Sequence, residues 1–111
     1  MTVAGPHDLG TPLVVTLDVD WVPDWMIEDV ANRLATWGVS ATLFATHKSP
    51  VLDELATDRR FEIGIHPNFL PGSTHGATPD EVLGTVKGWY PDARTCRTHS
   101  LAQSEPLLGL M

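Results

Sequence analysis

The chain has 111 residues, of which 42% are hydrophobic, and no low-complexity tract, so its length and composition fit one ordinary globular domain. Its formal net charge is −7, and its Lys and Arg residues form no stripe along the sequence, which excludes nucleic acid as a partner. No apolar run is long enough to cross a bilayer.

The first half of the chain predicts a strand and then a helix. Residues 1–12 form a lead that contains Gly and Pro, and the domain is expected over residues 13–111. Residues 13–17 (LVVTL) are a continuous apolar run, typical of a strand buried on both faces of a parallel sheet. A helix of about four turns should follow, opened by Pro23 and Asp24 and stopped by Gly38. Its apolar residues at helical spacing are Ile27, Val30, Leu34 and Trp37.

The middle of the chain continues this alternation. Residues 41–45 and 61–65 predict two further strands, and a short helix capped by Ser49 lies between them. Residues 67–77 contain two Pro and two Gly, which predicts a long loop, and long loops in compact domains are usually functional. Thr78 and the Pro and acids after it predict a helix up to about Trp89.

Residues 94–98 are expected to form a fourth strand, with a further helix beginning near residue 107. The resulting βαβαβαβ order predicts an α/β fold with about four parallel strands and right-handed crossovers. Four strands cannot close a barrel of this type, so the sheet stays open or the sequence is a fragment of a longer domain.

Side chains that bind metals or carry charge follow three of the predicted strands. Asp18 and Asp20 follow the first strand, His66 the third, and Arg97 and His99 the fourth. The carboxyl ends of parallel strands share one edge of the sheet, where sites form in α/β folds, so these side chains should converge. Because Asp18 and Asp20 are two residues apart, both should point to the same side of an extended chain.

Two carboxylates this close repel each other unless a cation compensates them, which favours a metal site. One Asp with two His is a common ligand set for a catalytic divalent metal. We expect Zn²⁺, with Co²⁺, Ni²⁺ or Fe²⁺ as alternatives, and the second carboxylate is then free to act as a base toward water.

Three segments resemble the motifs of the polysaccharide deacetylase domain, also called the NodB homology domain or carbohydrate esterase family four. LVVTLDVDW resembles its aspartate motif, EIGIHPNFLPGSTHG its histidine motif, and CRTHS its arginine motif. The short sequences DVD and HPNF are most similar to those of the WbmS-like subgroup, and the resemblance covers most of residues 13 to 100. It implies the N-terminal half of a distorted seven-stranded (β/α) barrel that removes N- or O-acyl groups from sugars.

Carried over to this chain, the resemblance implies that Asp18 is the catalytic base and that Arg97 holds it in place. It also implies that the metal is bound by Asp20, His66 and His75. The chain departs from the family pattern in two places in these motifs. Val19 separates two aspartates that are normally adjacent, which leaves open which of Asp18 and Asp20 takes which role. His66 and His75 are nine residues apart across the loop, whereas the family histidines are usually four apart.

The remaining site residues are expected to contact substrate. Trp21 could stack on a sugar ring or pack in the core. Asn68 and Phe69 are predicted to line the mouth of the site as a polar group and a wall. The family motif that supplies a histidine general acid has no counterpart before residue 111. His99 could take the acid role, and it is placed here among the substrate-binding residues.

The function that we expect is a metal-dependent hydrolase that acts on a C–N bond other than a peptide bond, in an acylated amino sugar or glycan precursor. Two alternatives stay open: a truncated, non-catalytic module that binds metal or sugar, and a Mg²⁺-dependent phosphoryl-transfer site built on the two aspartates. A homodimer could cover the open edge of the sheet. One cysteine and the lack of a secretory signal at the start of the sequence predict a reducing, cytoplasmic setting.

Overall fold

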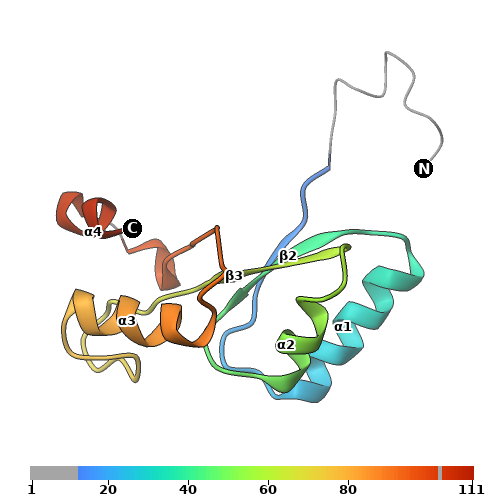
Figure 1. Cartoon of the computed structure of the whole chain (residues 1–111), viewed down its shortest axis with the longest axis horizontal. Coiled ribbons are helices and arrows are strands. Elements are labelled where there is room, and N and C mark those ends of the chain that lie inside the picture. The colour runs from blue at the N-terminus through green and yellow to red at the C-terminus, as the bar shows by residue number, and fades with distance from the viewer. Residues whose placement is uncertain (1–12, 103) are drawn as a thin grey trace, which may run out of the picture.

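The computed structural model describes residues 13–102 and 104–111. The expected lead, residues 1–12, therefore lies outside the described part of the chain. Within that part, strands and helices alternate along the sequence, and the three strands form one sheet (Figure 1). This confirms the predicted α/β class with an open parallel sheet.

The sheet consists of β1 (Thr16–Asp18), β2 (Ala41–Ala45) and β3 (Phe61–Ile65), side by side in that order and all parallel. Leu17 pairs with Leu43, and Leu43 pairs with Ile63, so the three strands are in register near their centres. The ranges predicted for β2 and β3 are confirmed. Each of these strands contains a short apolar run that is buried along most of its length.

β1 differs from its prediction. It is shorter and begins later than residues 13–17, and Leu13 and Val14 are 82% and 76% exposed. The prediction that this run is buried on both faces was wrong, because β1 is an edge strand that has only β2 beside it among the described residues. The predicted homodimer across this edge stays a prediction.

The predicted fourth strand is reduced to a single parallel bridge between Ile65 and Cys96. The amide of Ile65 donates to the carbonyl of Thr95 over 2.9 Å, and the amide of Arg97 donates to the carbonyl of Ile65 over 3.0 Å. Three strands therefore form the sheet instead of about four. The bridge still brings Arg97, and the residues after it, to the carboxyl end of β3.

The first three helices begin where the capping residues predict, and the last begins two residues before the expected position near residue 107. They are α1 (Asp24–Thr36), α2 (Pro50–Leu55), α3 (Pro79–Trp89), a short 3₁₀ turn (His99–Leu101) and α4 (Glu105–Leu110). The hydroxyl of Ser49 accepts the amide of Leu52 at the start of α2, and the hydroxyl of Thr78 accepts the amide of Glu81 at the start of α3.

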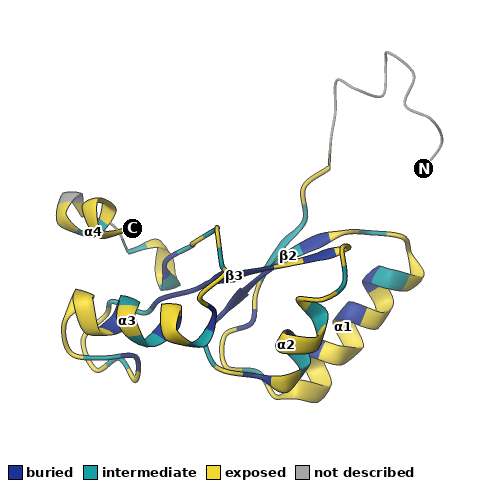
Figure 2. Cartoon of the chain, viewed as in Figure 1, coloured by how far each residue is buried: buried dark blue, intermediate teal, exposed yellow. Residues whose placement is uncertain are grey.

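The buried face of α1 is displaced from the predicted one. Ile27 and Leu34 are buried as expected, but Ala31 lies between them in the core and Trp37 is 67% exposed. The spacing of 27, 31 and 34 follows one face of the helix, whereas Val30 and Trp37 lie to its side. In Figure 2 the strands are largely buried and the outer surfaces of the helices are exposed.

One hydrophobic core joins the sheet to three helices. Residues of α1, α2 and α3 pack together with the strands, among them Ile27, Leu52, Leu43, Ile63 and Val86. None of the helices within residues 13–102 and 104–111 has both the length and the apolar character that a membrane crossing would require.

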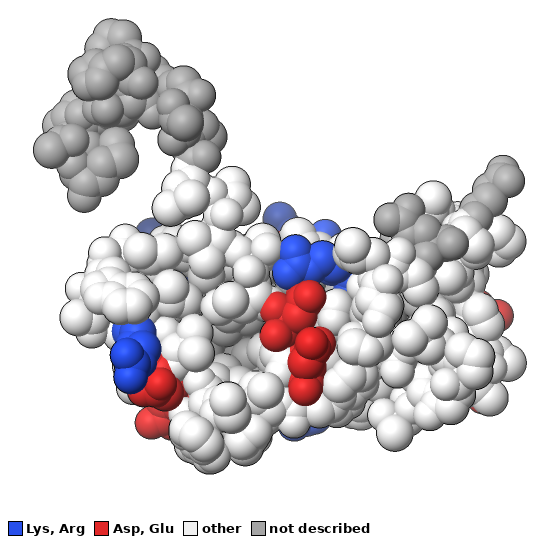
Figure 3. Space-filling view, turned by 180° about the vertical axis from the view of Figure 1, so that it is seen from behind, with Lys and Arg blue, Asp and Glu red and all other residues white. Residues whose placement is uncertain are grey.

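Charged side chains are sparse on the face of the molecule shown in Figure 3. A compact group of acidic side chains lies directly beside basic ones near the middle of this face, and the other basic side chains are scattered. This distribution offers no continuous basic surface that could follow a phosphate backbone on this face.

Candidate metal centre

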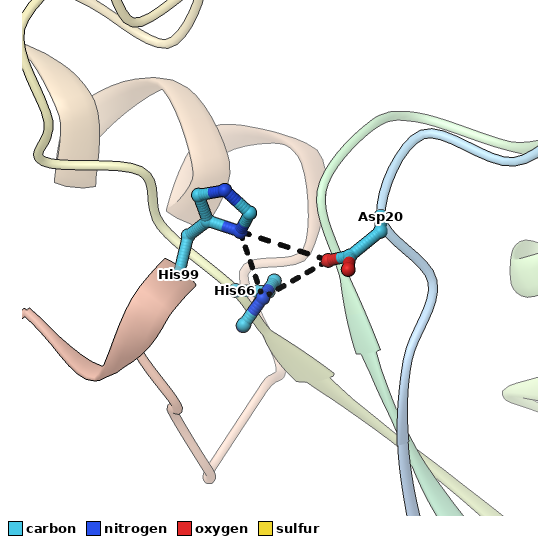
Figure 4. A group of neighbouring side chains, drawn as sticks. All are labelled: Asp20, His66 and His99. Atoms are coloured by element: carbon cyan, nitrogen blue, oxygen red, sulfur yellow. Dashed lines mark hydrogen bonds and ion pairs between the residues drawn. The ribbon is translucent and has the colours of Figure 1, made fainter.

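Three histidine and aspartate side chains from separate segments meet at the carboxyl edge of the sheet (Figure 4). Asp20 lies just after β1, His66 directly follows β3, and His99 begins the 3₁₀ turn after the bridge. Asp20 Oδ1 lies 3.2 Å from His66 Nε2 and 3.7 Å from His99 Nδ1, and the two histidine nitrogens are 3.4 Å apart. These three ligand atoms all lie within 4.8 Å of one another, which is close enough to share one metal ion.

The ring of His66 is held in the orientation that a metal ligand needs. Its Nδ1 lies within hydrogen-bond distance of the backbone carbonyl of Arg97, and because a carbonyl only accepts, Nδ1 must carry the hydrogen. In the neutral ring, Nε2 then presents a lone pair to Asp20 Oδ1. A backbone carbonyl that fixes the tautomer in this way is typical of metal-binding histidines. His66 Nε2 and Asp20 Oδ1 are then two acceptors that face each other at 3.2 Å, and a cation bound by both would compensate this contact.

Asp18 lies beside this group but is held by Arg97. Arg97 donates to Asp18 Oδ1 from Nε over 2.8 Å and from Nη2 over 2.6 Å, and its Nη1 donates to Thr16 Oγ1 over 2.9 Å. The guanidinium carbon also lies 4.4 Å from the ring centre of Phe44, a cation–π distance. Asp18 Oδ2 is left 3.7 Å from His66 Nε2, on the side of the candidate metal group.

Val19 explains how the two separated aspartates share one side. Its side chain is buried in the core, while Asp18 and Asp20 both lie within 4 Å of His66. Val19 therefore points into the core and both carboxylates lie on the side of the candidate site, as the spacing of two predicts, although β1 ends at Asp18 and Asp20 lies in the turn that follows.

His75 is engaged with Asn68 and Thr46 in this structure, and its predicted role as a metal ligand stays a prediction. Its Nδ1 accepts the amide of Asn68 over 2.9 Å, so its Nε2 carries the hydrogen and donates to the carbonyl of Thr46 over 2.6 Å. Burial is the main cause that lowers the pKa of His75, with smaller contributions from His66 and His99. The imidazole that stands beside Asp20 and His66 is that of His99, whereas both ring nitrogens of His75 are engaged within the fold.

The other predicted site residues surround this group to different extents. Trp21 is 40% exposed, and its ring centre lies 5.1 Å from that of His99 and 5.6 Å from that of His75. Asn68 lies in the loop, where its side-chain oxygen accepts the amide of Leu70, and Phe69 beside it is partly buried. Contacts of Trp21, Asn68 and Phe69 with a substrate remain predictions.

Thr46 is a further residue of this region that the sequence patterns did not predict. This residue directly follows β2 and is fully buried, and its hydroxyl accepts the amide of Trp21 over 2.8 Å. Its position could have indicated it, because Thr46 follows β2 as Asp20 follows β1 and His66 follows β3. None of the candidate site residues named above lines the hollow of about 450 Å³ that Lys48, Trp89 and Arg94 help to form.

Comparisons with known proteins agree with the motifs. The family model for WbmS-like polysaccharide deacetylases matches residues 15–111, and the chain therefore belongs to this family. The resemblance inferred from the sequence is thus confirmed. Among curated proteins, none is significantly similar to this chain.

A solved structure from Bordetella bronchiseptica, WbmS, is similar with 34% sequence identity and a TM-score of 0.80. It is described as a proposed polysaccharide deacetylase involved in O-antigen biosynthesis. The match covers 87% of this chain but only 41% of that protein, so this chain spans less than half the length of its solved relative.

Proposed function

We propose that this chain carries the metal ligands and the base of a metal-dependent hydrolase that removes an acyl group from an amino sugar or glycan precursor. The observation that carries this proposal is the convergence of Asp20, His66 and His99 beside Asp18, in a chain of the polysaccharide deacetylase family. The solved relative is described as involved in O-antigen biosynthesis, which supports a glycan precursor as the substrate class.

The proposed ligands are Asp20, His66 and His99. One carboxylate and two imidazoles suit Zn²⁺, or Co²⁺, Ni²⁺ or Fe²⁺, better than Mg²⁺, which prefers oxygen ligands, so the phosphoryl-transfer alternative is disfavoured. A divalent metal held there would supply Lewis acidity, which lowers the pKa of water and polarises a carbonyl oxygen.

Asp18 is the proposed base. Its Oδ2 is not engaged by Arg97 and faces the metal group, so it is the carboxylate oxygen available to take a proton from an attacking water. Water adds to the acyl carbon as Asp18 takes its proton, the C–N bond breaks, and that proton passes to the leaving nitrogen. The products are a carboxylic acid and an amine, which ionise to a carboxylate and an ammonium group. Arg97 keeps the carboxylate of Asp18 oriented through charge-assisted hydrogen bonds.

Trp21 is the proposed sugar contact. Its partly exposed ring lies beside His99, and an aromatic face can pack against the C–H surface of a sugar ring. Asn68 and Phe69 are proposed to line the same mouth from the loop. We also propose a cytoplasmic setting, which the single cysteine supports.

The test combines metal analysis with acyl release. The purified chain should bind one equivalent of Zn²⁺ or Co²⁺, and the metal-loaded protein should release acetate from some member of a panel of N-acetylated amino sugars. Asp18→Asn should lower release by about 10²-fold to 10⁴-fold while leaving the metal bound. Metal binding without release from any substrate, in this chain and in a longer polypeptide that contains it, would favour the non-catalytic binding module.

A further inference from the structure

The backbone at Asp20 and Trp21 is in an unusual conformation. Both residues have positive φ angles, 42° and 59°, in the left-handed region that residues other than glycine rarely occupy. Such backbone persists only where the surrounding structure holds it, and it is frequent at functional sites. A hydrogen bond of 2.9 Å from the amide of Val22 to the carbonyl of Val19 closes this turn.

A buried hydroxyl helps to hold the turn against the sheet, beside the hydrogen bond of 3.1 Å from the amide of Val19 to the carbonyl of Phe44. The amide of Trp21 donates to Thr46 Oγ1 over 2.8 Å, and Thr46 lies in the segment that directly follows β2. The same hydroxyl lies 3.0 Å from His47 Nδ1, to which it can donate its own hydrogen. Thr46 Oγ1 therefore has a donor and an acceptor as partners, which fixes its orientation.

Thr46 is itself anchored by the loop between β3 and α3. Its carbonyl accepts the hydrogen of His75 Nε2 over 2.6 Å, and His75 Nδ1 accepts the amide of Asn68. The rings of His75 and Trp21 are also in contact, with centres 5.6 Å apart. His75 thus reaches the Asp20 turn through Thr46 and through the ring of Trp21.

We propose that Thr46 is a positioning residue that sets the direction of the Asp20 carboxylate toward His66 and His99, through the amide of Trp21. Thr46 touches none of the three proposed ligands by its side chain, so its effect on the metal passes through the backbone of the turn. This inference rests on the proposed function, because Thr46 can affect metal binding only if Asp20 is a metal ligand.

The experiment compares Thr46→Val with Thr46→Ser in the present chain. Valine keeps the shape of threonine but removes the hydroxyl, whereas serine keeps the hydroxyl and loses a methyl group. Two quantities are measured: the hydrogen-exchange rate of the Trp21 amide in the metal-free protein, and the affinity for Co²⁺ followed by its absorption spectrum. Thr36→Val is the control, since the hydroxyl of Thr36 bonds only within α1, on its exposed side.

Thr46→Val should raise the exchange rate of the Trp21 amide by about 10-fold or more and weaken Co²⁺ binding by about 10-fold to 100-fold, the usual range for residues that orient a metal ligand. Thr46→Ser should restore both quantities to near the wild-type values, and Thr36→Val should change neither. If Thr46→Val does not fold, Thr46→Ala removes the same hydroxyl without adding bulk.

The outcomes separate the two proposals. Wild-type protein that binds no Co²⁺ would overturn the proposed function, and with it the role of Thr46 in metal binding. Co²⁺ binding in the wild type that Thr46→Val leaves unchanged would overturn the positioning role alone. A Trp21 amide that exchanges equally fast in both proteins would show that Thr46 does not hold the turn and would overturn the inference as well.

Discussion

Arg97 places two of its nitrogens, Nε and Nη2, on one oxygen of Asp18 and leaves the other oxygen facing His66. This arrangement assigns different tasks to the two oxygens of one carboxylate. Oδ1 fixes the orientation of Asp18, and Oδ2 is available to accept a proton. Asp20 has no such partner and lies instead between two imidazoles.

The two aspartates should therefore respond differently to substitution. Asp18→Asn should lower acyl release by about 10²-fold to 10⁴-fold, the usual contribution of a general base, and should change Zn²⁺ affinity little. Asp20→Asn should weaken the binding of Zn²⁺ by more than about 100-fold, because a direct ligand contributes more to the affinity than the residues that orient it. Isothermal titration and acetate release measure the two effects. The reverse pattern would exchange the roles of Asp18 and Asp20.

Arg97→Lys should retain the charge but lose the paired donors to Asp18. We expect acyl release to fall about 10-fold, which corresponds to about 1.4 kcal/mol, close to one hydrogen bond to a charged group. Zn²⁺ affinity should stay near the wild-type value because Arg97 contacts the candidate metal group only through its backbone carbonyl. A variant with full activity would show that Asp18 needs no orienting partner.

The third ligand can be identified by comparing two histidines. His99→Ala should reduce bound Zn²⁺ to a trace after dialysis, since it removes one of the three atoms within 4.8 Å of one another. His75→Gln should retain the metal through dialysis, because the ring nitrogens of His75 bind Asn68 and Thr46 and the residue affects Asp20 only indirectly, through Thr46 and Trp21. Metal loss in His75→Gln with full retention in His99→Ala would return the site to the ligand set that the family resemblance implies.

This comparison also shows where the sequence was sufficient and where it was not. The ends of β1 and β3 placed Asp18, Asp20 and His66 together, because parallel strands bring their carboxyl ends to one edge. The choice between His75 and His99 depends on the path of the loop after β3 and on the bridge at Cys96. Neither follows from local residue patterns.

Thr46 was missed for a related reason. A threonine after a strand carries no charge and binds no metal in most proteins, so its residue type gives no signal. Its importance comes from the positive φ angles at Asp20 and Trp21, and no glycine marks these positions in the sequence. Only the folded backbone reveals that the turn needs a partner.

Folding stability should depend on pH through His75. Burial lowers its pKa in the folded protein from the ordinary value of 6.5, so below that pH the unfolded chain binds a proton that the folded chain does not. Stability of the metal-free protein should therefore fall as the pH drops below about 6.5. His75→Gln should show a shallower fall in urea denaturation. Equal slopes in both proteins would contradict this origin.

Tyr90 should titrate far above the ordinary range. It is the single tyrosine of the chain, and burial raises its pKa to about 12. Its hydroxyl donates to the carbonyl of His47 over 2.8 Å and accepts the amide of Ser49 over 3.0 Å. The change in ultraviolet absorbance when a tyrosine loses its proton should report the ionisation of Tyr90 alone. The unfolded chain loses the proton first, so stability should fall as the pH rises above about 10.

Tyr90→Phe removes that hydroxyl and takes a partner from the buried amide of Ser49 and from the carbonyl of His47, a partly buried residue. We expect a loss of about 1–3 kcal/mol in the free energy of unfolding at neutral pH, measured by urea denaturation. The stability of the variant should also depend less on pH in the alkaline range. A change below about 0.5 kcal/mol would indicate that water replaces the hydroxyl at His47 and Ser49.

A substitution at Gly64 in β3 tests whether the ring of Phe44 holds Arg97 in place. A Cβ at this position would collide with Thr95 Oγ1 and would lie 2.8 Å from the ring of Phe44, on which Arg97 stacks. Gly64→Ala should therefore destabilise the fold by about 1–3 kcal/mol, the usual cost of overpacking, and should lower activity by displacing Arg97 from Asp18.

Gly84 supplies the matched control for this substitution. It lies in α3, and a Cβ there would meet no atom within 4 Å. Gly84→Ala should stabilise the fold by about 0.5–1 kcal/mol, because alanine favours a helix over glycine. Opposite signs in urea denaturation would trace the effect at Gly64 to crowding against Thr95 and Phe44. A neutral Gly64→Ala would mean that Thr95 and Phe44 can both move without cost, and Arg97 would then need only Thr16 and Asp18 to hold its place.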